Sequence, residues 1–160
     1  GETLEEAASR WLSEKTTVTD IYLEQLYAFG APQRDPRSRV ITVAYYALVS
    51  YEKLTPEGLN HPTDQTRWYD VGDLPELAFD HRRIVQFAIN RLKERLETSA
   101  IAFQLLPEKF TLTELQRVYE LILGRPLDKR NFRKKMLASG ILRELGETKM
   151  EGYHRPAQLY

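Results

Sequence analysis

Cysteine is absent from this chain of 160 residues, which excludes a disulfide framework, a thiolate metal site and a cysteine nucleophile. Long apolar runs are also missing. None approaches the roughly 20 residues that a membrane helix needs, and no apolar secretory segment opens the chain. We therefore expect a cytoplasmic protein without a membrane partner. Because 42% of the residues are hydrophobic, the composition predicts a folded protein with a core rather than a disordered chain.

Net charge is lacking as well, with 23 Lys or Arg against 23 Asp or Glu, but this balance hides two halves of opposite sign. Residues 1–109 carry 13 basic against 17 acidic side chains, whereas residues 110–160 carry 10 against 6. Such asymmetry predicts two modules with different partners. The apolar stretch that Pro107 ends is taken as the junction, which gives domains 1–99 and 100–160.

The front half mixes helical and extended patterns, as in an α+β fold. Thr3 and Glu6 form the capping box of a helix that is expected to end near Lys15, with Trp11 packed on its apolar face. Strands are expected at 21–29, 40–49 and 68–71, a loop at 54–67 and a long helix from Asp80 to Glu97. Both alternating faces of 40–49 are apolar, which predicts a central strand covered on both sides.

The back half has the order of elements found in a winged helix. Thr111 begins a helix that Gly124 stops, and Asp128 caps a second helix over 129–139. Strands are expected at 141–145 and 157–160, with a turn at 146–152. Helix, turn, helix and hairpin follow one another, and the hairpin tip is basic.

The second helix of this half carries the strongest functional signal. With Phe132, Met136 and Leu137 turned toward the core, the polar side chains point outward. Arginine matches guanine, asparagine matches adenine and lysine neutralises phosphate, so this face suits a DNA major groove. A solvated basic face without a ligand is the alternative, and Arg133, which lies between the apolar positions, has a structural reading too. The candidate DNA contacts are Lys129, Arg130, Asn131, Arg133, Lys134 and Lys135, with His154 and Arg155 at the hairpin tip.

Residues 1–18 resemble the second part of a Nudix box. The matching positions are Glu2, Arg10, Leu12, Glu14 and Val18, and the departures are Trp11 and Lys15 for glutamates and Thr17 for glycine. In that family, closely spaced glutamates hold the divalent cations that bridge a pyrophosphate. Mg²⁺ requires oxygen ligands, which neither an indole nor an ammonium group provides. The resemblance therefore implies a degenerate Nudix domain that is not an enzyme and needs no cofactor or metal.

Further segments, at 34–37, 73–75, 79–81, 105–116 and 131–133, resemble the NrtR-like group of Nudix-related transcriptional regulators. This resemblance covers the whole chain and implies a Nudix-type α/β/α sandwich followed by a winged helix. The sandwich needs strands before its box, so upstream residues are expected to be missing. The implied function is a homodimeric repressor of NAD metabolism genes that binds a palindromic operator and releases it on binding ADP-ribose or a related metabolite. The alternatives are a pentose-responsive regulator, an active ADP-ribose pyrophosphatase and a protein-interaction scaffold.

Candidate effector contacts lie in the front half. The turn at 33–39 holds three arginines, Arg34, Arg37 and Arg39, that suit a diphosphate, although pairing with Asp35 and nearby acids is the alternative. Tyr46 is a pocket candidate for which core packing is the competing reading. Arg10 and Glu14 remain as box residues, with a structural role in fixing the helix and its loop.

Overall fold

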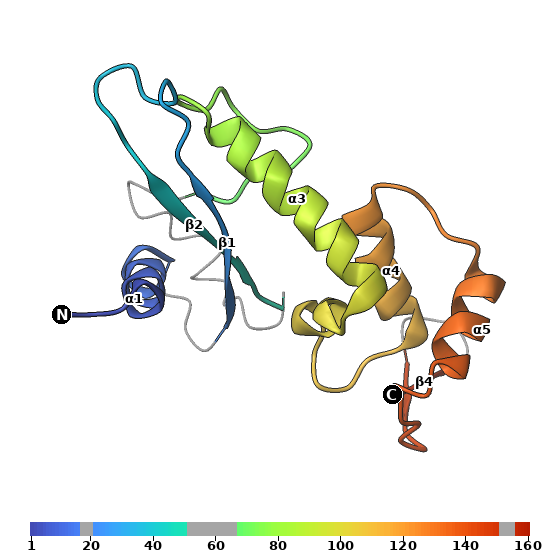
Figure 1. Ribbon diagram of the computed structural model, residues 1–160. Coiled ribbons are helices and arrows are strands. Elements are labelled where there is room, and N and C mark those ends of the chain that lie inside the picture. The colour runs from blue at the N-terminus through green and yellow to red at the C-terminus, as the bar shows by residue number, and fades with distance from the viewer. Residues whose placement is uncertain (17–20, 51–66, 151–155) are drawn as a thin grey trace. The chain divides into compact units, whose positions relative to one another are not determined.

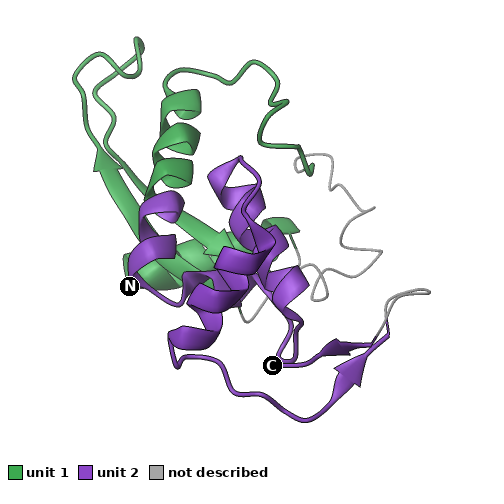
Figure 2. Cartoon of the chain, turned by 90° about the vertical axis from the view of Figure 1, so that its right-hand side faces the viewer, with its two compact units in different colours: residues 1–91 green, residues 92–160 purple. Residues whose placement is uncertain are grey.

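The computed structural model describes residues 1–16, 21–50, 67–150 and 156–160. The chain divides into two compact units, Gly1–Arg91 and Leu92–Tyr160 (Figure 2). The division falls inside a helix, while the domain boundary expected from the sequence lies at 99/100 and stays a prediction. In the described part, no helix combines the length and the apolar character that crossing a bilayer requires.

Helix α1 spans Leu4–Thr16 in the first unit. The expected capping box is confirmed, because the Thr3 hydroxyl accepts from the Glu6 amide at 3.1 Å and the Glu6 carboxylate accepts from the Thr3 amide at 2.7 Å. The expected burial of Trp11 is wrong. Its side chain is 53% exposed, and the charged ends of Arg10 and Lys15 lie 5.2 and 5.6 Å from the ring centroid. An apolar stripe alone does not ensure burial, because α1 has no buried residue.

Strands β1 (Tyr22–Phe29) and β2 (Thr42–Leu48) form an antiparallel pair beside α1 (Figure 1). Tyr22 is opposite Leu48 and Phe29 is opposite Thr42, with an irregularity between Gln25 and Tyr27. The prediction that 40–49 is a central strand is wrong for the described residues. There, β2 has β1 as its one neighbour, and only its last residue is buried.

The region before α3 also departs from expectation. Residues 68–71 form no strand but an irregular, exposed segment that runs into a turn, and most of the loop expected at 54–67 lies outside the described residues. Helix α3 then spans His81–Thr98, as predicted within a residue or two. The ring of Phe87 packs edge-on against that of Phe29, with 5.6 Å between the ring centroids, which joins the helix to the sheet of the first unit.

The second unit contains the winged-helix order of elements. They are the 3-10 helix η2 (Ile101–Leu105), helices α4 (Leu112–Leu123) and α5 (Lys129–Ala138), and strands β3 (Thr148–Lys149) and β4 (Ala157–Gln158). The prediction of a strand at 141–145 is wrong, because the paired strand β3 begins at Thr148, within the expected turn. Of the predicted strand, the Leu145 amide does donate to the Leu159 carbonyl at 3.1 Å. The core of this unit includes Leu96, Ile101, Ala102, Leu106, Phe110, Leu112, Leu115, Phe132, Met136 and Leu159.

Candidate nucleic-acid interface

Helix α5 is held at its start by a side chain and along its length by two buried residues. The Asp128 carboxylate accepts a hydrogen bond from the backbone N–H of Asn131 at 2.8 Å, which satisfies one of the free donors of the first turn. Phe132 and Met136, one turn apart, are buried as predicted. Leu137 was expected inside but is 52% exposed. It lies about 100° beyond Met136 around the helix and so turns away from the core.

The turn before α5 is fixed by the side chains of α4. Gly124 ends α4 in the left-handed region with φ 69°, and the Glu120 carboxylate accepts from Gln116 Nε2 at 2.9 Å and from the Leu127 amide at 2.8 Å. These hydrogen bonds, the Gln116 bond first, lower the pKa of Glu120. Glu120 therefore links α4 to the turn through two neutral donors, neither of which is a basic residue of α5.

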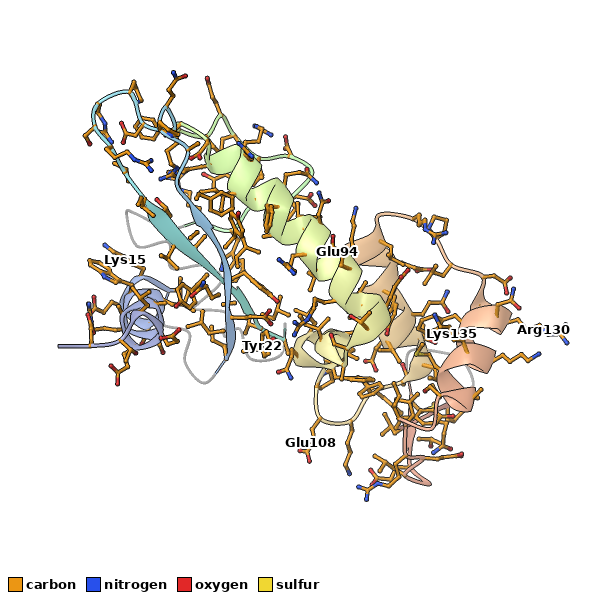
Figure 3. All side chains as sticks on the ribbon, in the orientation of Figure 1. Lys15, Tyr22, Glu94, Glu108, Arg130 and Lys135 are labelled. Atoms are coloured by element: carbon orange, nitrogen blue, oxygen red, sulfur yellow. The ribbon has the colours of Figure 1, made fainter. Side chains whose placement is uncertain are left out.

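The basic face of α5 points to solvent. No ion pair or hydrogen bond joins its four exposed cationic side chains to an acid within the described ranges, and Asn131 is exposed beside them. Figure 3 shows Arg130 extending away from the helix on the side remote from α4. Arg133 differs, because it is partly buried and its Nη2 donates to Thr113 Oγ1 at 3.4 Å. The four exposed cations are Lys129, Arg130, Lys134 and Lys135.

The wing is attached to the helices by charged and main-chain contacts. Lys149 Nζ lies 2.7 Å from the Glu114 carboxylate at the start of α4. Burial raises the pKa of Glu114, but the hydrogen bonds from Lys149 and Thr111 outweigh it and the pKa is lowered overall. Phe110 and Tyr160 exchange two backbone hydrogen bonds, of 3.1 and 2.9 Å, which places the last residues beside the entry to α4. The wing-tip candidates His154 and Arg155 lie outside the described residues.

The three arginines of the 33–39 turn all have partners inside the first unit. Arg34 is only 5% exposed and binds the Asp80 carboxylate through two nitrogens, at 2.7 and 2.9 Å. Arg37 pairs with Asp35 at 2.8 Å, and its guanidinium lies 4.7 Å from the centroid of the Phe79 ring. These contacts lower the pKa of Asp80 and bring that of Asp35 to about 2 through hydrogen bonds from the paired arginines.

Arg39 donates to the Gly30 carbonyl at 2.6 Å. The geometry therefore gives Arg34 a structural role, while Arg37, 71% exposed, and Arg39 stay predictions as ligand contacts. Arg37 also supports Phe79, whose φ of 52° is left-handed, a region that bulky residues seldom adopt. The turn is thus tied to Phe79 and Asp80, directly before α3. Pairing of the arginines with Asp35 and nearby acids was the alternative that sequence reasoning offered.

The remaining effector candidates lie on α1 and β2. Arg10 bridges two acids, with Glu2 at 2.6 Å and Glu14 at 3.3 Å, and its hydrogen bond to Glu2 lowers the pKa of that carboxyl group. This pairing matches the expected role in fixing the helix to its loop. The Tyr46 ring is half-buried, 6.3 Å from the Tyr22 ring. Nowhere among the described side chains do three or more His, Asp or Glu gather in a way that would hold a metal ion.

The geometry of the second unit defines a winged helix with a basic face that lacks acidic partners in the part of the chain that the structure describes, a class of protein typical of DNA binding. Residues 102–160 match the family model of the NrtR DNA-binding winged helix domain. Over its whole length the chain is similar to Shewanella oneidensis NrtR crystallised with a 27mer DNA, with a TM-score of 0.83, 35% identity and 73% of that chain covered. The chain belongs to the NrtR family.

Other relatives extend this picture. The ADPR responsive transcriptional repressor NtrR of Acinetobacter baylyi is 41% identical over 155 residues, which cover 96% of this chain and 61% of the repressor. A MutT/nudix family protein of Enterococcus faecalis matches the whole chain with a TM-score of 0.76 and 30% identity, over 70% of its own length. The ADP-ribose pyrophosphatase of Methanocaldococcus jannaschii is 33% identical over 86 residues, 54% of this chain and 49% of that enzyme.

These likenesses confirm the expected fold class, a Nudix-type unit followed by a winged helix. The chain spans 61% and 49% of the two curated relatives.

Proposed function

We propose that the protein is a transcriptional repressor that binds double-stranded DNA through α5. The observation that carries the proposal is the set of exposed cations on α5 that have no acidic partner among the described residues, while the cap and core contacts of the helix are made by other residues. Arg130 and Asn131, near the start of the helix, suit guanine and adenine edges, and Lys134 suits a phosphate. The similarity to a relative crystallised with DNA supports this assignment.

The proposed active form is a cytoplasmic homodimer on a palindromic operator. One α5 per subunit then enters each of two major grooves about 34–36 Å apart, as in other two-fold helix-turn-helix proteins. In such a dimer the two half-sites add their contacts to the total affinity for DNA. The genes proposed as targets are those of NAD metabolism, in line with the family resemblance.

The proposed effector is ADP-ribose or a related nucleotide, bound by the first unit, with a pentose sugar as the alternative. Support comes from the ADPR-responsive relative and from the exposed guanidinium of Arg37 in the turn at 33–39. Helix α3 runs without a break through the division between the two units. A ligand that favours one dimer geometry over another would change the half-site spacing through this helix, which is how it would weaken DNA binding.

We further propose that the first unit is not a hydrolase. Trp11 and Lys15 stand at two glutamate positions of the Nudix box, and the remaining Glu2 and Glu14 are both paired with Arg10. The second candidate function, an ADP-ribose pyrophosphatase, is favoured by the partial similarity to such an enzyme. Incubation of the chain with ADP-ribose and Mg²⁺ should yield no AMP, and AMP release at an enzyme-like rate would establish the second candidate instead.

The DNA-binding assignment is tested with the double variant Arg130→Ala/Lys134→Ala. The probe is a duplex that the unaltered chain selects from a random-sequence library, compared with a scrambled duplex. We expect affinity for the selected duplex to fall by roughly 100-fold or more, because a base contact and a phosphate contact are lost per subunit. Arg67→Ala/Arg83→Ala removes the same charge from exposed positions of the first unit and serves as the control. Equal affinities for the two double variants would contradict the assignment.

A further inference from the structure

The second unit contains a cavity of about 230 Å³ behind α5, between the end of α3, α4 and α5. Its inner wall is apolar and partly aromatic. The ring of Tyr119 meets that of Phe132 edge-on at 5.2 Å, and the Tyr119 hydroxyl is turned to the Leu96 carbonyl at 3.4 Å. The apolar lining residues are Leu96, Tyr119, Leu123, Leu127, Phe132 and Met136.

Charged and polar side chains surround the apolar wall. Arg125 and Lys135 bring two cations, and neither has an ion-pair partner among the described residues. Of the two acids, Asp128 is already engaged as the cap of α5, at the positive end of that helix, which leaves Glu97 as the one acid without such a role. The polar groups still available for a ligand are therefore the two cations, the side-chain amide of Asn131 and the Glu97 carboxylate.

We infer that this cavity binds a small apolar carboxylate, such as an aryl-substituted or branched aliphatic acid. Its hydrocarbon part fills the space against Leu123 and Met136, and its carboxylate pairs with Lys135 or Arg125. The size of the cavity limits the ligand to one ring or a short chain, because drug-sized ligands occupy about 300 Å³ or more. The proposed nucleotide site belongs to the first unit and is separate.

Occupation of the cavity engages part of the DNA-binding face. Lys135 and Asn131 line the cavity, whereas Arg130 and Lys134 do not. In Figure 3, Lys135 lies on the side of α5 that is turned to α4, and Arg130 points away from it. This consequence rests on the proposed DNA-binding function: a carboxylate held by Lys135 removes that cation from DNA and lowers affinity. The cavity thus provides a second way to regulate α5.

The chain contains two methionines, and they make a matched pair of reporters. Met136 lines the cavity and is buried, while Met150 is 67% exposed and outside it. With ¹³C-methyl methionine, phenylacetate titrated into the full chain should shift the Met136 methyl resonance saturably and leave Met150 unmoved. We expect half-saturation at roughly 1 mM, the range for a ligand of about ten heavy atoms. 2-Phenylethanol, which keeps the ring but lacks the charge, should bind about 5- to 10-fold more weakly.

Three variants separate the possible outcomes. The double variant Lys135→Gln/Arg125→Gln should reduce the affinity for phenylacetate to that for the alcohol. Leu123→Trp should fill the cavity and abolish the shift of the Met136 resonance. Arg130→Gln should leave the phenylacetate affinity and the Met136 shift unchanged. Equal shifts at both methionines, equal affinity for acid and alcohol, or an unmoved Met136 would each overturn the inference. So would a Met136 resonance that moves with protein concentration alone, since a second copy of the chain would then occupy the site. Because no DNA is present, these outcomes do not depend on the proposed function.

Discussion

Salt dependence gives the most quantitative test of how α5 binds DNA. Each cation that neutralises a phosphate releases a counterion, so the logarithm of the binding constant falls with the logarithm of salt at a slope of about −0.9 per contact. If all four exposed cations of α5 contact phosphates, the slope reaches about −3.6 per subunit and about −7 for a dimer. Between about 50 and 200 mM KCl, that corresponds to a loss of affinity on the order of 100-fold per subunit.

Lys134→Gln should reduce the steepness of this slope by about 0.9 per subunit, because one phosphate contact is lost while the packing of α5 is kept. Fluorescence anisotropy with the selected duplex at four KCl concentrations measures it. Arg83→Gln, an equal change of charge on an exposed residue of the first unit, is the control and should leave the slope as it was. If Lys134→Gln lowers affinity equally at every salt concentration, or not at all, Lys134 does not contact a phosphate and the reasoning fails.

Three further predictions concern stability. Thr111→Val should lower the free energy of unfolding by about 1 kcal/mol in urea titrations because the helix cap is lost, whereas Thr111→Ser should retain most of it. The pKa of Asp80 is lowered by its hydrogen bonds from Arg34, so this pairing stabilises the fold fully above the ordinary aspartate pKa of about 4. The stabilisation is lost as the pH falls through the lowered pKa, and the Tm of the unaltered chain should fall with it. In Asp80→Asn the decrease of Tm below about pH 5 should be smaller. Phe132→Ala should cost about 3–5 kcal/mol, since a buried ring is removed, and an unchanged urea midpoint would contradict the packing of α5.

Helix ends were the most predictable part of the fold. The capping pair of Thr111 and Glu114, the cap at Asp128 and the left-handed Gly124 are each set by residues within a few positions of one another. Such signals are local, and therefore a single sequence contains them in full. The helices α4 and α5 of the winged helix could be predicted because both ends of α4 and the start of α5 are of this kind.

Features that depend on distant partners were predicted less well. The segment expected as a strand at 141–145 is irregular, and the strand ladder of the wing begins only at Thr148, because strand pairing depends on the opposing segment as well as on local propensity. Trp11 was expected inside because of its helical spacing, but spacing does not say whether another element covers that face. The cavity behind α5 was missed for the same reason, since it exists only where three helices meet.

Arginine illustrates why residue type alone could not locate the ligand contacts. Arg34 and Arg130 read alike in the sequence, each in a basic segment. Arg34 is 5% exposed and tied to Asp80 by two hydrogen bonds, so its loss would disturb the fold. Arg130 has no intramolecular partner in the described part of the chain, and α5 is held by Asp128 and Phe132 instead. A change at Arg130 therefore reports on binding with little effect on folding, whereas a change at Arg34 mixes the two.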